Sequence, residues 1–324
     1  MTSEQSARSD EQAATLELRE ASFCGAGRAR TAPLSVSSPA RRIGLVGPWE
    51  PLFQALTGDA RVSSGSARIF DCDIERALRS SVVGLALCDP PLPAWCSVSE
   101  YLEHAAALNH GARARAETDA RRVLEEYGLA DLAALKLGQL LLYQRRALGI
   151  ALAAVTAPPV LCLEAPLRNL DAASADYVAR LCAHAAGRSR LVISADLPSA
   201  ANAERTLLDA CDELFLLQDG ALVAHGSAES VLAPSAYYLM TLVGTKDHEL
   251  ILALKAGGCQ LGTQPSPTTF SALLPPNSRV TRYLVELPEA ASSDLVLDAA
   301  LDAGVTVLEL EPVPRAQHHF TRTL

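Results

Sequence analysis

Short apolar runs alternate with helical periodicities between residues 16 and 226. Alternating positions predict a strand over Leu16–Phe23, and the apolar run Arg41–Gly47 predicts a buried strand that ends at a Gly-Pro turn. Leu52–Gly58 then predicts a short helix. Short strands separated by helices are typical of an α/β sheet that is buried on both faces. The other strands expected in this region are Ser64–Ile74, Ser81–Leu87, Val160–Glu164 and Arg190–Ser194, with a hairpin over Glu213–Gly226.

A helical region interrupts this alternation. Ser97 and Glu100 have the spacing of a capping box, and the apolar positions that follow keep a helical period as far as Leu108. The pattern predicts a helical subdomain at about 90–155, inserted into the α/β domain. Its later helices are expected over Glu117–Tyr127 and Gly138–Val155, and those that follow the subdomain over Ala172–Ala186 and Pro198–Ala210.

The character of the sequence changes past residue 244. Residues 260–278 are rich in Pro, Ser and Thr and predict a loop. We therefore predict a flexible tail over 1–14, an α/β domain over 15–240 and an accessory α/β domain over 246–312. The elements expected in the accessory domain are a helix over Ile251–Ala256 and a βαβ-like unit made of Val280–Leu287, Ser293–Ala303 and Val305–Leu310.

Composition and charge exclude several classes of function. The 324 residues carry a net charge of −9, which argues against nucleic acid as a partner. No apolar run is long enough to span a bilayer, so direct membrane insertion is not expected. The eight cysteines form no C-x-x-C pair and the seven histidines no H-E-x-x-H pattern. We therefore expect reduced thiols and no metal site.

The order of these segments resembles the ATPase subunit of ATP-binding cassette (ABC) transporters over about residues 16–240. The resemblance implies a P-loop NTPase-like ABC ATPase fold with an inserted α-helical subdomain, followed by a small C-terminal α/β domain. The segments that carry it are Gly44–Pro48 and Ser64–Phe70 around the phosphate loop, Asp89–Leu102 after the Q-loop, Gln144–Pro166 from the signature helix into Walker B, Leu167–Ser174 at the D-loop, and Asp212–Leu232 at the end of the ATPase domain.

The phosphate loop departs most from the family pattern. A loop of the form G-x-x-x-x-G-K-[S/T] holds phosphates with backbone N–H groups, a lysine and a hydroxyl on Mg²⁺. Here the chain runs Gly47, Pro48, Trp49, Glu50, Pro51 and directly into a helix, and no lysine precedes Lys136. The Glu50 carboxylate would repel phosphate, and Pro51 has no N–H. This degenerate Walker A loop is not expected to bind ATP.

The other family motifs are also altered. The resemblance places Glu164 at the Walker B aspartate, Ala165 at the catalytic glutamate, Cys88 at the Q-loop glutamine, Asp196 at the switch histidine and Phe23 at the aromatic that stacks adenine. Loss of a general base typically slows a reaction by about 10²–10⁴-fold, so no catalytic residue is expected. The signature L-S-G-G-Q reads Leu140, Leu141, Leu142, Tyr143 and Gln144, so its small residues are replaced by bulky ones, while Gln144 and the D-loop residues Leu170 and Asp171 keep the family's identities.

Three positions keep two interpretations each. Phe23 is either the adenine-stacking aromatic or a core residue beside its strand. Glu164 is either a Walker B remnant or a polar residue at a strand end. Leu140–Leu142 is either a packing surface or an exposed apolar contact for a partner.

These observations lead to one hypothesis and two alternatives. The chain is expected to be a catalytically degenerate ABC ATP-binding-cassette subunit, a pseudoenzyme with a structural or regulatory role. The resemblance implies an ABC permease or an intact ABC ATPase subunit as its partner, assembly as a dimer, and a peripheral position at the cytoplasmic face of the plasma membrane. The first alternative is a functional or weak ATPase subunit of an exporter, and only this alternative calls for ATP and Mg²⁺ as cofactors. The second is a soluble ABC-fold binding module without a permease.

Overall fold

The structure is a computed structural model that divides into two compact units, Met1–Ala228 and Glu229–Leu324. It describes residues 14–25, 31–110, 113–196, 202–218, 220–232, 237–243, 247–264, 280–288, 291 and 293–312. The flexible tail expected over 1–14 therefore lies outside the described residues, except for Ala14.

A six-stranded sheet with the order β10-β9-β3-β8-β7-β6 forms the centre of the first unit. Five strands are parallel and β10 is an antiparallel edge, as the expected hairpin requires. All four residues of β7 are buried, which is typical of a parallel sheet covered on both faces. The strands are β3 (Arg42–Val46), β6 (Val83–Ala86), β7 (Val160–Leu163), β8 (Arg190–Ala195), β9 (Glu213–Gln218) and β10 (Ala221–Gly226).

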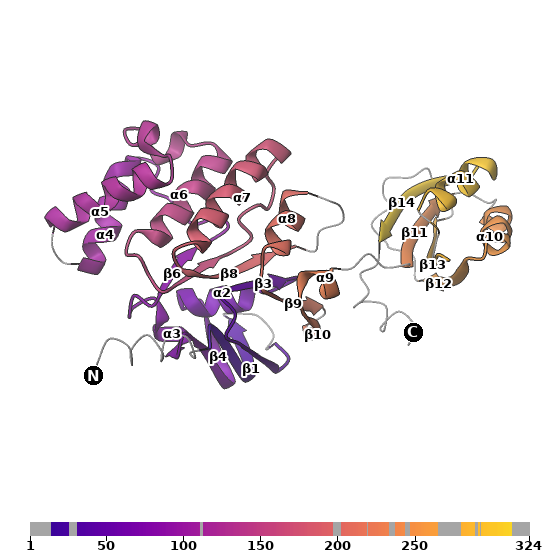
Figure 1. The fold of residues 1–324 in the computed structure, drawn as a ribbon, viewed down its shortest axis with the longest axis horizontal. Coiled ribbons are helices and arrows are strands. Elements are labelled where there is room, and N and C mark those ends of the chain that lie inside the picture. Colours follow the sequence, from indigo (N-terminus) through magenta and orange to yellow (C-terminus); the bar gives the residue numbers. More distant parts are fainter. Residues whose placement is uncertain are drawn as a thin grey trace. The chain divides into compact units, whose positions relative to one another are not determined.

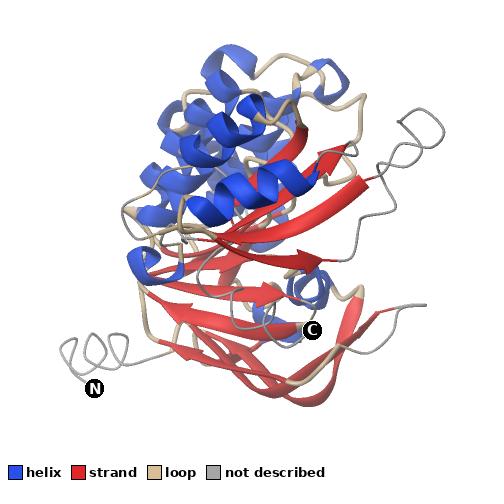
Figure 2. Cartoon of the chain, turned by 90° about the vertical axis from the view of Figure 1, so that its right-hand side faces the viewer, coloured by secondary structure: helices blue, strands red, loops and turns tan. Residues whose placement is uncertain are grey.

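Helices lie on one side of this sheet in both views of the chain (Figure 1, Figure 2). They are α6 (Leu142–Ala154), α7 (Ala172–Ala186) and α8 (Ala203–Asp209). On the other side, α2 (Glu50–Thr57) packs against strands of a second sheet, β1 and β4. That sheet has the order β2-β1-β4-β5 and consists of β1 (Leu16–Gly25), β2 (Leu34–Ser38), β4 (Ala60–Ile69) and β5 (Cys72–Asp73), with the short α3 (Ile74–Ala77) after it.

Helix α2 anchors the larger hydrophobic core. Leu52, Phe53 and Leu56 are buried along one face of the helix, and they join Trp49 in a cluster with residues from both sheets. The helix ends at Gly58, whose φ of +86° is the left-handed conformation that terminates helices and favours glycine. The segment that resembles a phosphate loop therefore leads directly into a hydrophobic core of the first unit.

The helical subdomain begins as the sequence predicts. Helices α4 (Val98–His110) and α5 (Arg113–Glu126) pack together. The predicted capping box is confirmed, because Glu100 Oε2 accepts from the Ser97 N–H at 2.8 Å and Ser97 Oγ accepts from the Glu100 N–H at 3.3 Å. Two short 3₁₀ turns follow, η1 (Ala130–Leu132) and η2 (Leu137–Gln139).

The next helix starts later than expected. We predicted a helix from Gly138, whereas α6 begins at Leu142. The backbone is extended at Leu140 and Leu141, with ψ values of 135° and 162°, so the helical hydrogen-bond pattern cannot begin before them.

The second unit is a four-stranded antiparallel sheet with the order β12-β13-β11-β14. The expected βαβ-like unit is present as β13-α11-β14, but β11 lies between its two strands, which is the split βαβ arrangement. β11 pairs with β13 and β14 and therefore belongs to this unit. The unit thus starts before residue 246, the start that the sequence predicted. Its elements are β11 (Tyr237–Val243), α10 (Asp247–Ala256), β12 (Gln260–Gln264), β13 (Val280–Glu286), α11 (Asp294–Asp302) and β14 (Thr306–Pro312), and the short α9 (Ala228–Val231) precedes them.

Within the ranges that the structure describes, every helix is too short or too polar to span a bilayer.

Candidate functional site

The turn between β3 and α2 is closed around Trp49. Gly47 has a φ of +96°, and a Cβ there would lie 2.1 Å from the carbonyl oxygen of Leu217, so this position requires glycine. The Trp49 side chain is only 1% exposed, and its Nε1–H donates to the carbonyl of Val46 at 3.1 Å. A large indole therefore occupies the interior behind the turn.

Most backbone donors in this turn are already used by the chain. Pro48 and Pro51 have no N–H, and Glu50 brings a carboxylate to the start of α2. An anion site needs several N–H groups that converge on open space. Three of the four N–H groups of residues 47–52, those of Gly47, Trp49 and Leu52, donate to the backbone carbonyls of Ala195 at 3.0 Å, Gly47 at 2.9 Å and Trp49 at 3.0 Å.

A single cation links two of the expected site residues. Arg168 makes a bidentate pair with Asp196, with Nη2 2.7 Å from Oδ1 and Nε 2.9 Å from Oδ2. The same Nη2 lies 3.5 Å from Oε1 of Glu50. The hydrogen bonds that Arg168 donates to Asp196 are the main cause that raises the pKa of Arg168 above its usual value. Arg168 therefore joins the start of α2 to the end of β8.

Glu164, which the sequence resemblance places at the Walker B aspartate, is hydrogen-bonded to the segment that follows β6. Glu164 Oε2 accepts the backbone N–H of Cys88 at 3.0 Å, so these two predicted residues lie together. Burial is the main cause that raises the pKa of the Cys88 thiol. Ala165 is buried with a φ of +38°, and its N–H donates to Ser194 Oγ at 3.0 Å. The methyl group at this position has no proton to give or take.

The signature equivalents lie elsewhere, at the start of α6. Leu140 is buried, whereas Leu141 is 59% and Leu142 39% exposed, so the first packs and the other two face outward. Gln144 Oε1 accepts the N–H of Leu141 at 2.8 Å and thereby uses one of the donors at the helix N-terminus. The Tyr143 ring packs edge-on against Tyr177, with 5.7 Å between their centroids.

Asp171, which the sequence resemblance places at the D-loop, acts as a helix cap. Asp171 accepts the backbone N–H of Ser174 at 3.1 Å and its hydroxyl at 2.6 Å. These hydrogen bonds lower the pKa of Asp171. Leu170 is half-buried beside it. The identity of Asp171 is thus explained by the start of α7 alone.

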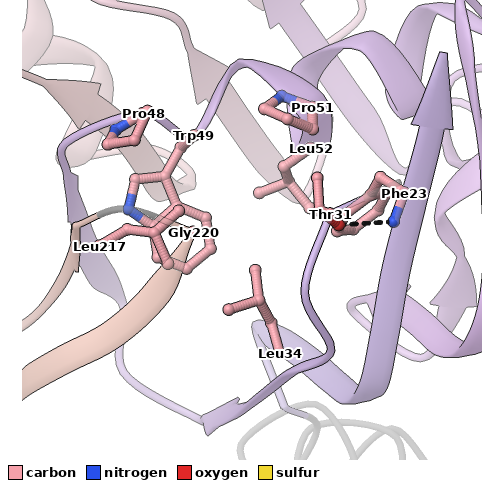
Figure 3. A pocket seen from close by; sticks show the side chains of 9 residues that line it. All are labelled: Phe23, Thr31, Leu34, Pro48, Trp49, Pro51, Leu52, Leu217 and Gly220. Atoms are coloured by element: carbon pink, nitrogen blue, oxygen red, sulfur yellow. Dashed lines mark hydrogen bonds between the residues drawn. The ribbon is translucent and has the colours of Figure 1, made fainter. Parts of the chain in front are cut away.

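An apolar cavity of about 220 Å³ lies beside the Pro48–Trp49 turn. Phe23 is 2% exposed and belongs both to the core cluster and to the wall of this cavity. Figure 3 shows Phe23 and Trp49 on opposite sides of the cavity, with Leu34 between them. The full lining is Phe23, Thr31, Leu34, Pro48, Trp49, Pro51, Leu52, Leu217 and Gly220.

Sequence reasoning missed Arg168. The residue lies within the D-loop segment, between the acidic position Glu164 and the helix cap Asp171. An isolated arginine among acidic positions could have suggested an ion pair, but its partners are 28 and 118 residues away in the chain. Only the folded arrangement identifies them.

Comparisons with known proteins bear on the fold. No family model and no curated protein matches the sequence. Among solved structures, CbiO1 from Clostridium perfringens, described as part of the ABC transporter complex CbiONQ, matches with a TM-score of 0.56 and 18% identity. The match covers 67% of this chain and 90% of that chain. The fold expected from the sequence is thus confirmed: the first unit has the ABC ATPase fold with an inserted helical subdomain.

The ion pair of Arg168 with Asp196 is expected to stabilise the folded chain. Arg168→Ala is expected to lower the free energy of unfolding by about 1 kcal/mol, because the pair is bidentate but partly solvated. Arg168→Lys should restore only part of this loss, since an ammonium cannot make the paired hydrogen bonds. Urea unfolding at low salt and in ~1 M NaCl measures this loss of unfolding free energy. The high salt concentration should remove most of the difference in stability between Arg168→Ala and the unsubstituted chain.

Arg19→Ala is the matched control. Arg19 pairs with Glu17 two residues away, and its side chain is 74% exposed, compared with 29% for Arg168. Equal effects of the two substitutions would show that Arg168 has no special role in holding the turn.

Proposed function

We propose that this chain is a catalytically degenerate ABC-type subunit that neither binds nor hydrolyses ATP. In this proposal it is a structural or regulatory partner of a permease or an intact ATPase, at the cytoplasmic face of the membrane. The observation that supports it best is the Arg168 bridge, because the chain's own cation and two carboxylates meet at the start of α2. That position corresponds, by the sequence resemblance, to the place where the triphosphate would be held.

The residues present do not fit Mg-ATP. Glu50 and Asp196 are carboxylates that would face the phosphates, and the Arg168 charge is already paired with them. Glu164 uses one oxygen for the N–H of Cys88.

The free energies of the missing contacts indicate that ATP binding would be lost and not merely weakened. A hydrogen bond to a charged group contributes about 1.5–3 kcal/mol. A micromolar affinity corresponds to only about 8 kcal/mol, so removal of the lysine, the loop donors and the Mg²⁺ hydroxyl accounts for all of it.

Hydrolysis by the purified chain tests the catalytic half of the proposal. We expect the unsubstituted chain and a Glu164→Gln variant to release phosphate from Mg-ATP at the same rate. The reason is that Ala165 offers no carboxylate to activate water. The first alternative, a working ATPase, requires a rate that falls at least about 10²-fold in Glu164→Gln. Such a fall would refute the proposal.

Assembly is tested separately from catalysis. The name of CbiO1 places that protein in a transporter complex, and the shared fold supports a comparable partner for this chain. The tagged full chain, expressed in the organism that encodes it, should be recovered from solubilised membranes together with a multi-span permease. Recovery of the chain alone from the soluble fraction would instead support the second alternative, a binding module that works without a permease.

A further inference from the structure

The apolar cavity beside the Pro48–Trp49 turn is lined in part by residues that the sequence resemblance places at the nucleotide site, but the proposed function assigns it no ligand. It lies wholly within the first unit, and its volume is about 220 Å³. Most of its wall is buried, whereas the residues near its mouth are partly or fully exposed. The buried members are Phe23, Leu34, Trp49, Leu52 and Leu217, and the exposed or half-buried ones are Thr31, Pro48, Pro51 and Gly220.

The two polar side-chain atoms of this lining each make a hydrogen bond within the chain. The Trp49 Nε1–H donates to the carbonyl of Val46, and Thr31 Oγ1 accepts the backbone N–H of Phe23 at 2.8 Å. A phosphate or a nucleobase in the cavity would lose its hydrogen bonds to water and regain few from the wall. The lining therefore favours a ligand without charge and with few polar atoms.

We propose that this cavity binds an uncharged aromatic molecule of about two fused rings. A cavity of about 150 Å³ with a similar apolar lining is large enough to bind benzene, so the larger volume here suits a bicyclic ring. Phe23 and Trp49, on opposite sides of the cavity, offer the edge and face contacts that aromatic rings prefer. The proposed function rests on the phosphate contacts of the turn, whereas this inference rests on the apolar wall of the cavity, so the two are tested separately.

The experiment uses naphthalene as the probe and the ¹⁵N-labelled full chain as the receptor. The chain has only two tryptophans, so its spectrum contains two indole N–H signals, and Trp95→Phe assigns them. Trp95 is 75% exposed and lies outside the cavity lining. We expect the Trp49 signal to shift and saturate as naphthalene is added, while the Trp95 signal stays in place. Adenosine at the same concentration should move neither signal.

A pair of leucine substitutions locates the binding. Leu34→Phe places a ring in the cavity and should weaken naphthalene binding at least about tenfold, or about 1.4 kcal/mol. Leu108→Phe is the matched control, since Leu108 is 90% exposed on α4 and should leave the affinity unchanged. If Leu34→Phe does not fold, NOEs from naphthalene to the Trp49 ring and Leu34 methyl protons give the location without any substitution.

Several results would overturn the inference. They are a Trp49 shift that grows linearly without saturation, equal binding in Leu34→Phe and in Leu108→Phe, the absence of NOEs to Trp49 and Leu34, or saturable binding of adenosine. None of these outcomes would restore the phosphate contacts missing from the turn, so the proposed function would stand or fall separately.

Discussion

Replacing Trp49 with alanine should lower the free energy of unfolding by about 3–5 kcal/mol, the usual cost of removing a large buried ring. Trp49 is 1% exposed and packs with Leu52 and Phe53 in the core around α2. Trp49→Phe keeps most of the ring but loses the hydrogen bond to Val46, so it should cost only about 1–2 kcal/mol. Urea unfolding followed by circular dichroism measures both losses.

The second tryptophan is a matched control. Trp95 is 75% exposed, and Trp95→Ala should change the stability by less than about 0.5 kcal/mol. A loss in Trp49→Ala no larger than in Trp95→Ala would mean that Trp49 does not fill the interior. The turn would then have room to rearrange around a phosphate, and the account of the site would fail.

Mg-ATP should leave the thermal stability of the chain unchanged. A ligand that binds only the folded state at 1,000 times its Kd adds about 4.1 kcal/mol to the free energy of unfolding. Millimolar Mg-ATP would therefore stabilise a micromolar site strongly and raise the midpoint of thermal unfolding by several degrees. The missing donors and the two carboxylates near Arg168 remove that effect.

Thermal unfolding with Mg-ATP, with MgCl₂ alone and with no addition measures this prediction. The three midpoints should coincide. An intact ABC ATPase, treated in the same way, shows that the assay detects nucleotide binding. A midpoint that rises with the logarithm of the ATP concentration in this chain would contradict the prediction.

The sequence predicted those parts of the fold that depend on local patterns. The buried strands β3, β7 and β8 are short apolar runs, and the Ser97–Glu100 cap is a pairing of residues three apart, so both could be identified from neighbours alone. β11 was missed because its apolar run Tyr237–Val243 spans residue 240, the predicted end of the first domain. Its sheet partners lie about 40 to 70 residues further along the chain.

The site was predictable only as a set of absences. The missing lysine and the residues Glu50, Ala165 and Asp196 can be seen in the sequence. The contacts that the site does make run across the fold, such as that of Arg168 with Glu50, which lie 118 residues apart. The burial of the Trp49 ring and the apolar cavity beside it could not be predicted either. The sequence of a turn does not show whether a tryptophan side chain in it points into the core or into solvent.

The central claim is that the chain's own residues, and no nucleotide, occupy the place of the triphosphate. The most direct test is a crystal of the full chain soaked with Mg²⁺ and a non-hydrolysable ATP analogue. We expect no analogue density between Pro48 and Leu52, and we expect Arg168 still paired with Asp196. Triphosphate density in that turn, with Arg168 released from Asp196, would contradict the account.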